Sequence, residues 1–238
     1  MLALSCLLRR GIVAALLALV LPAVVAAEGL RVSPVSLEVT APGATTSLTL
    51  RNEGRETITV QARVFRWVQR NGRETLERTQ DVVVSPPMTR LAPRTAQTIR
   101  VVRTGKSPVV GEEAYRVIID EVPDRAASRG QTVAFATELR IPVFFVSPVA
   151  SLPAVRWSLR ETGAGIVLQA QNRGEMRLRL ADLRLGQDGK VVLRRDGLLG
   201  YVLGGSVMQW NLGGAARGIN SLTATTNFSI INAPVARQ

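Results

Sequence analysis

The sequence predicts an all-β protein built from two immunoglobulin-like β-sandwich domains. Three observations lead to this fold class. Apolar and polar residues alternate with a period of two along most of the chain, which is the pattern of half-buried strands. Turn-forming residues interrupt this alternation at short, regular intervals, as they do in β-sandwiches. After residue 27, no segment shows the 3.6-residue apolar period of an amphipathic helix.

The first 27 residues predict an export signal that is cleaved after Ala27. Arg9 and Arg10 precede an apolar stretch at residues 11–25, and small side chains surround the expected cleavage site. The alternative is a transmembrane anchor, but a membrane span needs about 20 apolar residues, and this stretch has only fifteen. We therefore expect an exported chain that does not insert into a membrane after cleavage.

Residues 28–147 predict the first sandwich. Its expected strands lie at residues 47–51, 57–68, 81–85, 95–103, 114–122 and 131–146. The dipeptide Asn71-Gly72 follows the second of these runs and predicts a two-residue hairpin, because both residue types tolerate a positive φ. Pro123 ends the fifth run, since proline cannot donate to a strand ladder. A polar loop at residues 124–130 separates it from the sixth, which is the longest extended run of the chain.

Residues 148–153 predict a stiff connector, because Pro148 and Pro153 bracket a short run between the two halves. Residues 154–238 then predict a second, smaller sandwich. Its expected strands lie at residues 155–159, 166–171, 176–185, 201–203, 207–210 and 222–228.

The composition excludes several classes of chemistry. The chain contains no histidine, and its one cysteine, Cys6, lies in the expected signal. Imidazole mechanisms, disulfides and His- or Cys-ligated metals are therefore excluded. The paired acids Glu112-Glu113 and Asp120-Glu121 are adjacent on expected strands, where neighbouring side chains point to opposite faces. We expect neither an enzyme nor a bound cofactor or metal.

Positive charge is spread along the chain rather than clustered. The chain has 30 Lys and Arg against 18 Asp and Glu, and its net charge of +12 falls to +10 when Arg9 and Arg10 leave with the signal. An aromatic content of 4% argues against a surface for stacking bases. We expect mostly solvated arginines and no nucleic-acid partner. The alternative, a polyanion-binding module, predicts strongly salt-dependent binding.

Three runs of residues carry a resemblance to a known family. Residues 85–93 hold two adjacent prolines followed by Arg90, Leu91 and another proline; residues 112–123 contain a Tyr-Arg pair and end in Asp-Glu-Val-Pro; residues 139–145 read Leu-Arg-Ile-Pro-Val-Phe-Phe. In this order they resemble the pilus-assembly (fimbrial) chaperones of chaperone–usher systems, particularly their non-typical, archaic-like branch. The resemblance spans residues 30–228.

The resemblance implies two sandwiches set at an angle in a periplasmic protein. Such chaperones bind pilus or fibre subunits by lending them a strand and deliver them to an outer-membrane usher. Here the lent strand would be residues 131–146. One of its two alternating rows would fill the groove of the subunit: Val133, Phe135, Thr137, Leu139 and Ile141. The alternative is that this run is an ordinary core strand.

The family's cleft residues do not all recur in this chain. In the best-known members an arginine and a lysine bind the C-terminal carboxylate of the subunit, but these positions here hold Val35 and Pro142. We expect Arg116 and Arg140 to take over this role, with Arg90 behind them, because a guanidinium binds a carboxylate through two donors. The alternative is that these arginines are solvated or paired with Glu138 or Asp120. The family's interdomain arginine is also absent, with Val146 in its place.

A second class of function remains open from the sequence. An exported structural or adhesive protein of the fibre itself would also be a β-sandwich. Such a subunit would lack its seventh strand and carry an N-terminal donor extension, whereas Leu30 begins an expected strand almost at once after the signal. This feature favours the chaperone.

Overall fold

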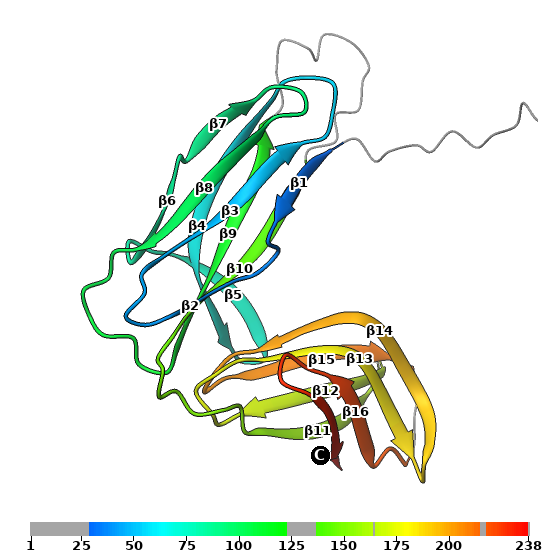
Figure 1. The fold of residues 1–238 in the computed structure, drawn as a ribbon. Helices are drawn as coiled ribbons and strands as arrows, with labels where there is room; N and C mark the ends of the chain where they lie inside the picture. Colours follow the sequence, from blue (N-terminus) through cyan, green and yellow to red (C-terminus); the bar gives the residue numbers. More distant parts are fainter. Residues whose placement is uncertain (1–28, 123–136, 164, 215–217, 238) are drawn as a thin grey trace, which may run out of the picture.

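The computed structural model describes residues 29–122, 137–163, 165–214 and 218–237, and all regular structure in these ranges is β-strand. Figure 1 shows two layered bodies whose long axes lie at an angle. The prediction of an all-β protein with two immunoglobulin-like sandwiches is confirmed. The expected signal and the loop at residues 124–130 fall outside the described residues. In the described ranges, no helix is long and apolar enough to cross a membrane.

Among the described residues, the first sandwich contains ten strands in two sheets. One sheet has the order β1-β3-β8-β6; the other has the order β2-β10-β9-β4-β5, with β7 also paired to β4. The strands are β1 (Leu30–Ser33), β2 (Leu37–Thr40), β3 (Thr45–Asn52), β4 (Ile58–Arg70), β5 (Arg73–Arg78), β6 (Val82–Ser85), β7 (Met88–Leu91), β8 (Ala96–Arg103), β9 (Glu112–Val122) and β10 (Glu138–Val146).

Alternation along these strands produces the first core. Leu48 and Leu50 of β3 are buried while their neighbours are exposed, and Val117 and Ile119 of β9 meet them from the other sheet. Burying an aliphatic side chain of this size stabilises a fold by about 1.5–3 kcal/mol. The outer face of the β9 sheet carries the opposite parity, which includes Arg116.

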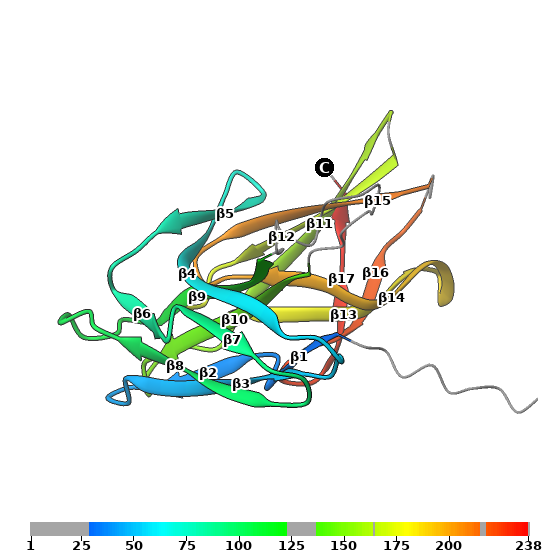
Figure 2. The ribbon, with the colours of Figure 1, turned by 90° about the horizontal axis from the view of Figure 1, so that it is seen from above.

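The turn between β4 and β5 confirms the predicted hairpin. Asn71 has φ 54° and Gly72 has φ 77°, as a two-residue turn with both central residues at positive φ requires. The same turn reaches the second sandwich, where the backbone N–H of Gln209 donates to the carbonyl of Gly72 over 3.1 Å. Figures 1 and 2 show this hairpin extending towards β15 (Val207–Gly213).

In the described part of the second sandwich there are two four-stranded sheets, ordered β15-β12-β11-β18 and β14-β13-β16-β17. Its other strands are β11 (Val155–Thr162), β12 (Gly165–Asn172), β13 (Leu178–Gln187), β14 (Lys190–Val202), β16 (Ser221–Thr225), β17 (Ile230–Pro234) and β18 (Ala236–Arg237). Strand β14 is much longer than predicted, since only residues 201–203 were expected there. It lies at a sheet edge and is mostly exposed on both faces, so its sequence shows no alternation.

No sheet within the described ranges combines strands of both sandwiches. A small core joins them instead, formed by Trp67, Phe144 and Val146 of the first sandwich and Leu203 of the second. Trp67 of this junction also lies beneath Arg116, one of the predicted functional residues.

Candidate functional site: the open edge of strand β10

Strand β10 has an open edge. It pairs with β9 along its whole length, but β2 pairs only with residues 143–146. Within the described ranges, residues 138–142 therefore have a strand partner on one side only. The N–H of Glu121 donates to the carbonyl of Thr137, so the odd-numbered residues of β10 bond to β9. The outward groups are then the N–H and C=O of Glu138 and Arg140 and the C=O of Pro142.

The side chains of β10 alternate between two environments. Ile141 is 4% exposed and, with the half-buried Leu139, packs into the first core, whereas Glu138 and Arg140 are exposed. The structure thus corrects the predicted groove-filling row at these two positions, because their side chains already fill their own sandwich. Thr137 is half-buried, and Val133 and Phe135 lie outside the described residues.

Arg116 and Arg140 lie on the outer face of adjacent strands, as expected. Arg140 faces Ile118 across the ladder, and Arg116 faces Pro142. The exposed Arg140 donates its Nε–H to Glu138 Oε1 over 2.6 Å. This is one of the carboxylate pairings considered as the alternative to a role in binding.

Arg116 has a more confined environment. Its side chain is 14% exposed, its guanidinium carbon lies 3.8 Å from the centroid of the Trp67 ring, and its Nη2 donates to Glu74 Oε2 over 3.1 Å. Its Nε is buried and has no hydrogen-bond partner among the described residues. Burial lowers the pKa of Arg116, and the positive charge of Arg140 lowers this pKa further. A cation with an unused buried donor favours an additional anionic partner.

Arg90 does not lie behind these two arginines. It is exposed on β7 and pairs with Thr59 of β4, whereas Arg116 faces Phe65 on the same strand. Six residues of strand span about 20 Å. The prediction of a third arginine in this cluster is therefore wrong, because the hairpin places Arg90 towards the other end of the sheet.

Three residues around Arg116 were not predicted from the sequence. Trp67 forms the surface beneath the guanidinium, and Tyr201 of the second sandwich contacts Trp67 edge-on, with ring centroids 5.3 Å apart. Glu74 supplies the carboxylate. Trp67 stands on the outward parity of its strand, which was visible in the sequence, but its neighbours come from separate parts of the chain.

An ion cluster, in which Arg177 and Glu112 are buried, joins the two sandwiches. Arg177, which precedes β13, bonds to Glu112 of β9 and Glu38 of β2, and its guanidinium carbon lies 3.6 Å from the centroid of the Phe144 ring. The Glu112 side chain is 1% exposed. Burial raises the pKa of Glu112, while Arg177 opposes this rise. Arg177 thus supplies an interdomain ion pair although Val146 stands where the family has an arginine.

A second clamp uses Gln69 at the end of β4. Its Nε2–H donates to the carbonyl of Tyr201 over 2.8 Å, and its Oε1 accepts the N–H of Leu203 over 2.9 Å. Gln69, Leu203 and Glu112 are among the residues that line a hollow of about 240 Å³ between the sandwiches. The structure therefore fixes the two sandwiches through several independent polar contacts.

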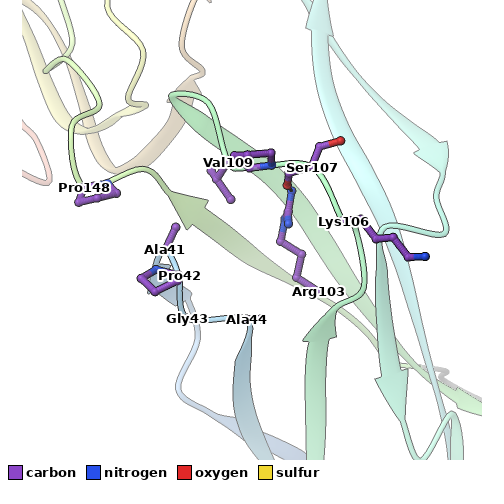
Figure 3. A pocket seen from close by; sticks show the side chains of 10 residues that line it. Ala41, Pro42, Gly43, Ala44, Arg103, Lys106, Ser107, Val109 and Pro148 are labelled. Atoms are coloured by element: carbon purple, nitrogen blue, oxygen red, sulfur yellow. Dashed lines mark hydrogen bonds between the residues drawn. The ribbon is translucent and has the colours of Figure 1, made fainter.

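A larger hollow of about 430 Å³ lies at the base of the first sandwich, between residues 41–44, residues 106–109 and Pro148 (Figure 3). Arg103 lines it but is bound to Glu113 through Nε at 2.8 Å and Nη2 at 2.7 Å. Its charge is thus already compensated. In the part of the chain that the structure describes, no group of three or more Cys, Asp or Glu residues is placed to hold a metal.

Comparisons with known proteins agree with this architecture. Among solved structures, a chain of the CsuC–CsuE chaperone–tip adhesion subunit pre-assembly complex, from the archaic chaperone–usher Csu pili of Acinetobacter baumannii, superimposes with a TM-score of 0.70 at 20% identity. The match covers 88% of this chain and 99% of that chain. The Salmonella enterica complex of SafA pilin with the SafB chaperone gives a TM-score of 0.61 at 19% identity, covering 87% and 96%.

The Pseudomonas aeruginosa CupB2 chaperone gives a TM-score of 0.56 at 18% identity, covering 86% of this chain and 98% of that chain. At these identities the likeness establishes the fold. Curated protein sequences give no significant match. Residues 29–150, about half of the chain, match the family model described as "Pili and flagellar-assembly chaperone, PapD N-terminal domain". The chain therefore belongs to the family of pili and flagellar-assembly chaperones.

Proposed function

We propose that this protein is a periplasmic chaperone that binds pilus or surface-fibre subunits by lending them strand β10 and delivers them to an outer-membrane usher. We also propose that residues 1–27 direct export and are removed after Ala27. The mature chain then comprises domains 28–147 and 154–238, joined by the connector 148–153. The family is one of chaperones, which supports a binding role rather than catalysis.

The open edge of β10 is the observation that carries this proposal. Outward-pointing N–H and C=O groups of Glu138 and Arg140 can continue a ladder into a subunit that lacks a strand. Each such hydrogen bond contributes about 0.5–1.5 kcal/mol net. Two of the matched structures carry descriptions that name a chaperone together with a subunit, CsuC with CsuE and SafB with SafA, which supports the same class of partner.

The side chains that we propose to enter the subunit groove belong to the N-terminal part of the lent strand. Because Leu139 and Ile141 belong to the first core, the row Val133, Phe135 and Thr137 is left for this role.

Arg116, assisted by Arg140, is proposed to bind the C-terminal carboxylate of the subunit. The Trp67 surface holds the guanidinium in one orientation, and its Nε is unused. A hydrogen bond to a charged group contributes about 1.5–3 kcal/mol. Replacing Arg116 by Gln is expected to lower subunit affinity correspondingly, about tenfold or more.

The strand-lending step can be tested at Arg140 with two variants. The full chain is co-expressed with neighbouring exported β-proteins, and periplasmic extracts are examined for a stable 1:1 complex. Arg140→Ala removes only the side chain, whereas Arg140→Pro also removes an outward N–H that β9 does not use. We expect the alanine variant to weaken the complex only through the loss of the assisting charge, and the proline variant to lose the complex.

Thermal unfolding of both variants provides the control for folding. A folded Arg140→Pro protein that recovers as much complex as the wild type would contradict strand donation at this edge. A fibre subunit, the alternative class, would instead polymerise with its own copies through an N-terminal extension. Recovery of this chain in such polymers rather than in a 1:1 complex would favour that alternative.

A further inference from the structure

We propose that Glu74 is a placeholder: in the free protein it occupies the position at Arg116 that the C-terminal carboxylate of a bound subunit takes, and the subunit displaces it. This inference rests on the proposed function and adds a residue that sets the specificity of the same site.

The first step in the argument is that the Arg116 guanidinium is held in place before any partner arrives. The ring of Trp67 lies 3.8 Å from the guanidinium carbon, and Tyr201 packs against that ring from the second sandwich. The side chain is largely buried. Its orientation is therefore set by packing, and Glu74 is not needed to hold it.

The second step is that Glu74 binds Arg116 weakly. Only one hydrogen bond connects them, from Arg116 Nη2 to Glu74 Oε2 over 3.1 Å, and the Glu74 side chain is 43% exposed. Strand β5, which carries Glu74, lies at the edge of its sheet. A partly exposed pair of this kind contributes only about 0–1 kcal/mol, so a better-placed carboxylate can replace it.

The third step concerns what the incoming carboxylate gains. A guanidinium has five N–H donors in a planar fork. Within the described residues, the buried Nε–H of Arg116 donates to no acceptor. A carboxylate that engages two donors forms a stronger bond than the single contact of Glu74. Arg140 adds a second positive charge close enough to affect Arg116 electrostatically.

Glu74 then determines which ligands can bind. While it is in place, the charge of Arg116 is compensated, and a ligand without a carboxylate gains nothing by approaching. A chain terminus with a free carboxylate exchanges one anion for another and keeps the cation satisfied throughout. The placeholder thus favours a true C-terminus over an internal segment of chain.

The test uses a synthetic peptide of alternating valine and threonine with a free C-terminal carboxylate, and the same peptide with a C-terminal amide. Binding of both to the full mature protein is measured by fluorescence anisotropy. Wild-type protein is expected to prefer the acid, and Arg116→Gln to abolish the preference. Glu74→Gln is expected to strengthen the preference about two- to fivefold, because the competing anion is gone.

Glu77→Gln is the matched control. Glu77 lies on the same strand and pairs with Arg70 over 2.7 Å, away from Arg116. The substitution should leave the acid-to-amide ratio unchanged. An unchanged or smaller ratio in Glu74→Gln would overturn the placeholder. Equal binding of acid and amide to the wild type and to Arg116→Gln would instead overturn the proposed anchor.

A second probe tests the placeholder independently of strand donation. Sodium acetate is titrated into the wild type and into Glu74→Gln while the NMR signal of the Arg116 Nε–H group is followed. The shift is expected to saturate at a several-fold lower acetate concentration in the variant. Identical titrations would overturn the inference even if neither peptide binds.

Discussion

Gly72 and Gly189 occupy the same type of turn, so comparing their substitutions distinguishes the effect of backbone strain from the effect of interdomain packing. Gly72 has φ 77° and Gly189 has φ 80°, and each follows an Asn or Asp that also has a positive φ. A Cβ at Gly72 would lie 2.8 Å from Gln209 Cγ. A Cβ at Gly189 would meet no atom of the described residues within 4 Å. The two positions therefore differ only in what the added methyl group contacts.

Replacing either glycine by alanine is expected to lower the free energy of unfolding by about 1–2 kcal/mol, because L-residues disfavour positive φ. Only Gly72→Ala should also push Gln209 away and weaken its hydrogen bond to the Gly72 carbonyl. Urea unfolding measures the first effect, and small-angle X-ray scattering measures the spacing of the two sandwiches. Scattering curves that are the same for both variants would contradict an interdomain role for Gly72.

A sequence pattern predicts a feature of a residue only when neighbouring residues in the chain determine that feature. Asn71-Gly72 predicts its own turn because the required φ values belong to those two residues alone. Arg116 could be identified from its strand and its charge. Trp67, Tyr201 and Glu74 could not be assigned to it, because they reach it through pairing and domain packing that no local pattern encodes.

At the scale of the element, strand β10 shows what periodicity can and cannot determine. The run from residue 131 to residue 146 was predicted as a strand, and residues 138–146 form one. A period of two defines two rows but does not say which row faces the core. The apolar row at Leu139 and Ile141 was assigned to a partner, and the structure assigns it to the first core.

Truncation of neighbouring residues on β10 tests this assignment. Ile141→Ala is expected to lower the free energy of unfolding by about 2–5 kcal/mol, as for other buried aliphatic side chains. Arg140→Ala, one position away on the exposed row, is expected to change it by less than about 0.5 kcal/mol. Urea unfolding of the two variants measures both. A similarly small change in unfolding free energy for both variants would mean that Ile141 belongs to the exposed row.

For the whole molecule, the decisive contacts are those between the sandwiches. Two domains could be predicted from the strand runs and the prolines between them, but their mutual placement could not. Because Val146 stands where the family has its interdomain arginine, the sequence predicts no contact that fixes the two domains. Arg177 supplies one from the residue just before β13, since only the folded chain brings it to Glu112 and Glu38. Such buried pairs are better explained by a fixed geometry than by added stability.

The Glu112 pair makes a specific prediction about pH. Burial raises the pKa of Glu112 above its ordinary value, so the folded protein holds this proton more tightly than the unfolded chain does. The corresponding stability is present below the ordinary pKa of 4.5 and is lost as pH rises through the raised pKa of the folded state.

Glu112→Gln cannot titrate, so it should lack this decline, although it loses the charge that faces Arg177. Urea unfolding of both proteins across this pH window should show the difference in unfolding free energy, variant minus wild type, increasing with pH. A constant difference would mean that Glu112 has the same pKa in the folded and unfolded states, and burial of its carboxyl beside Arg177 and Glu38 would then have no electrostatic consequence.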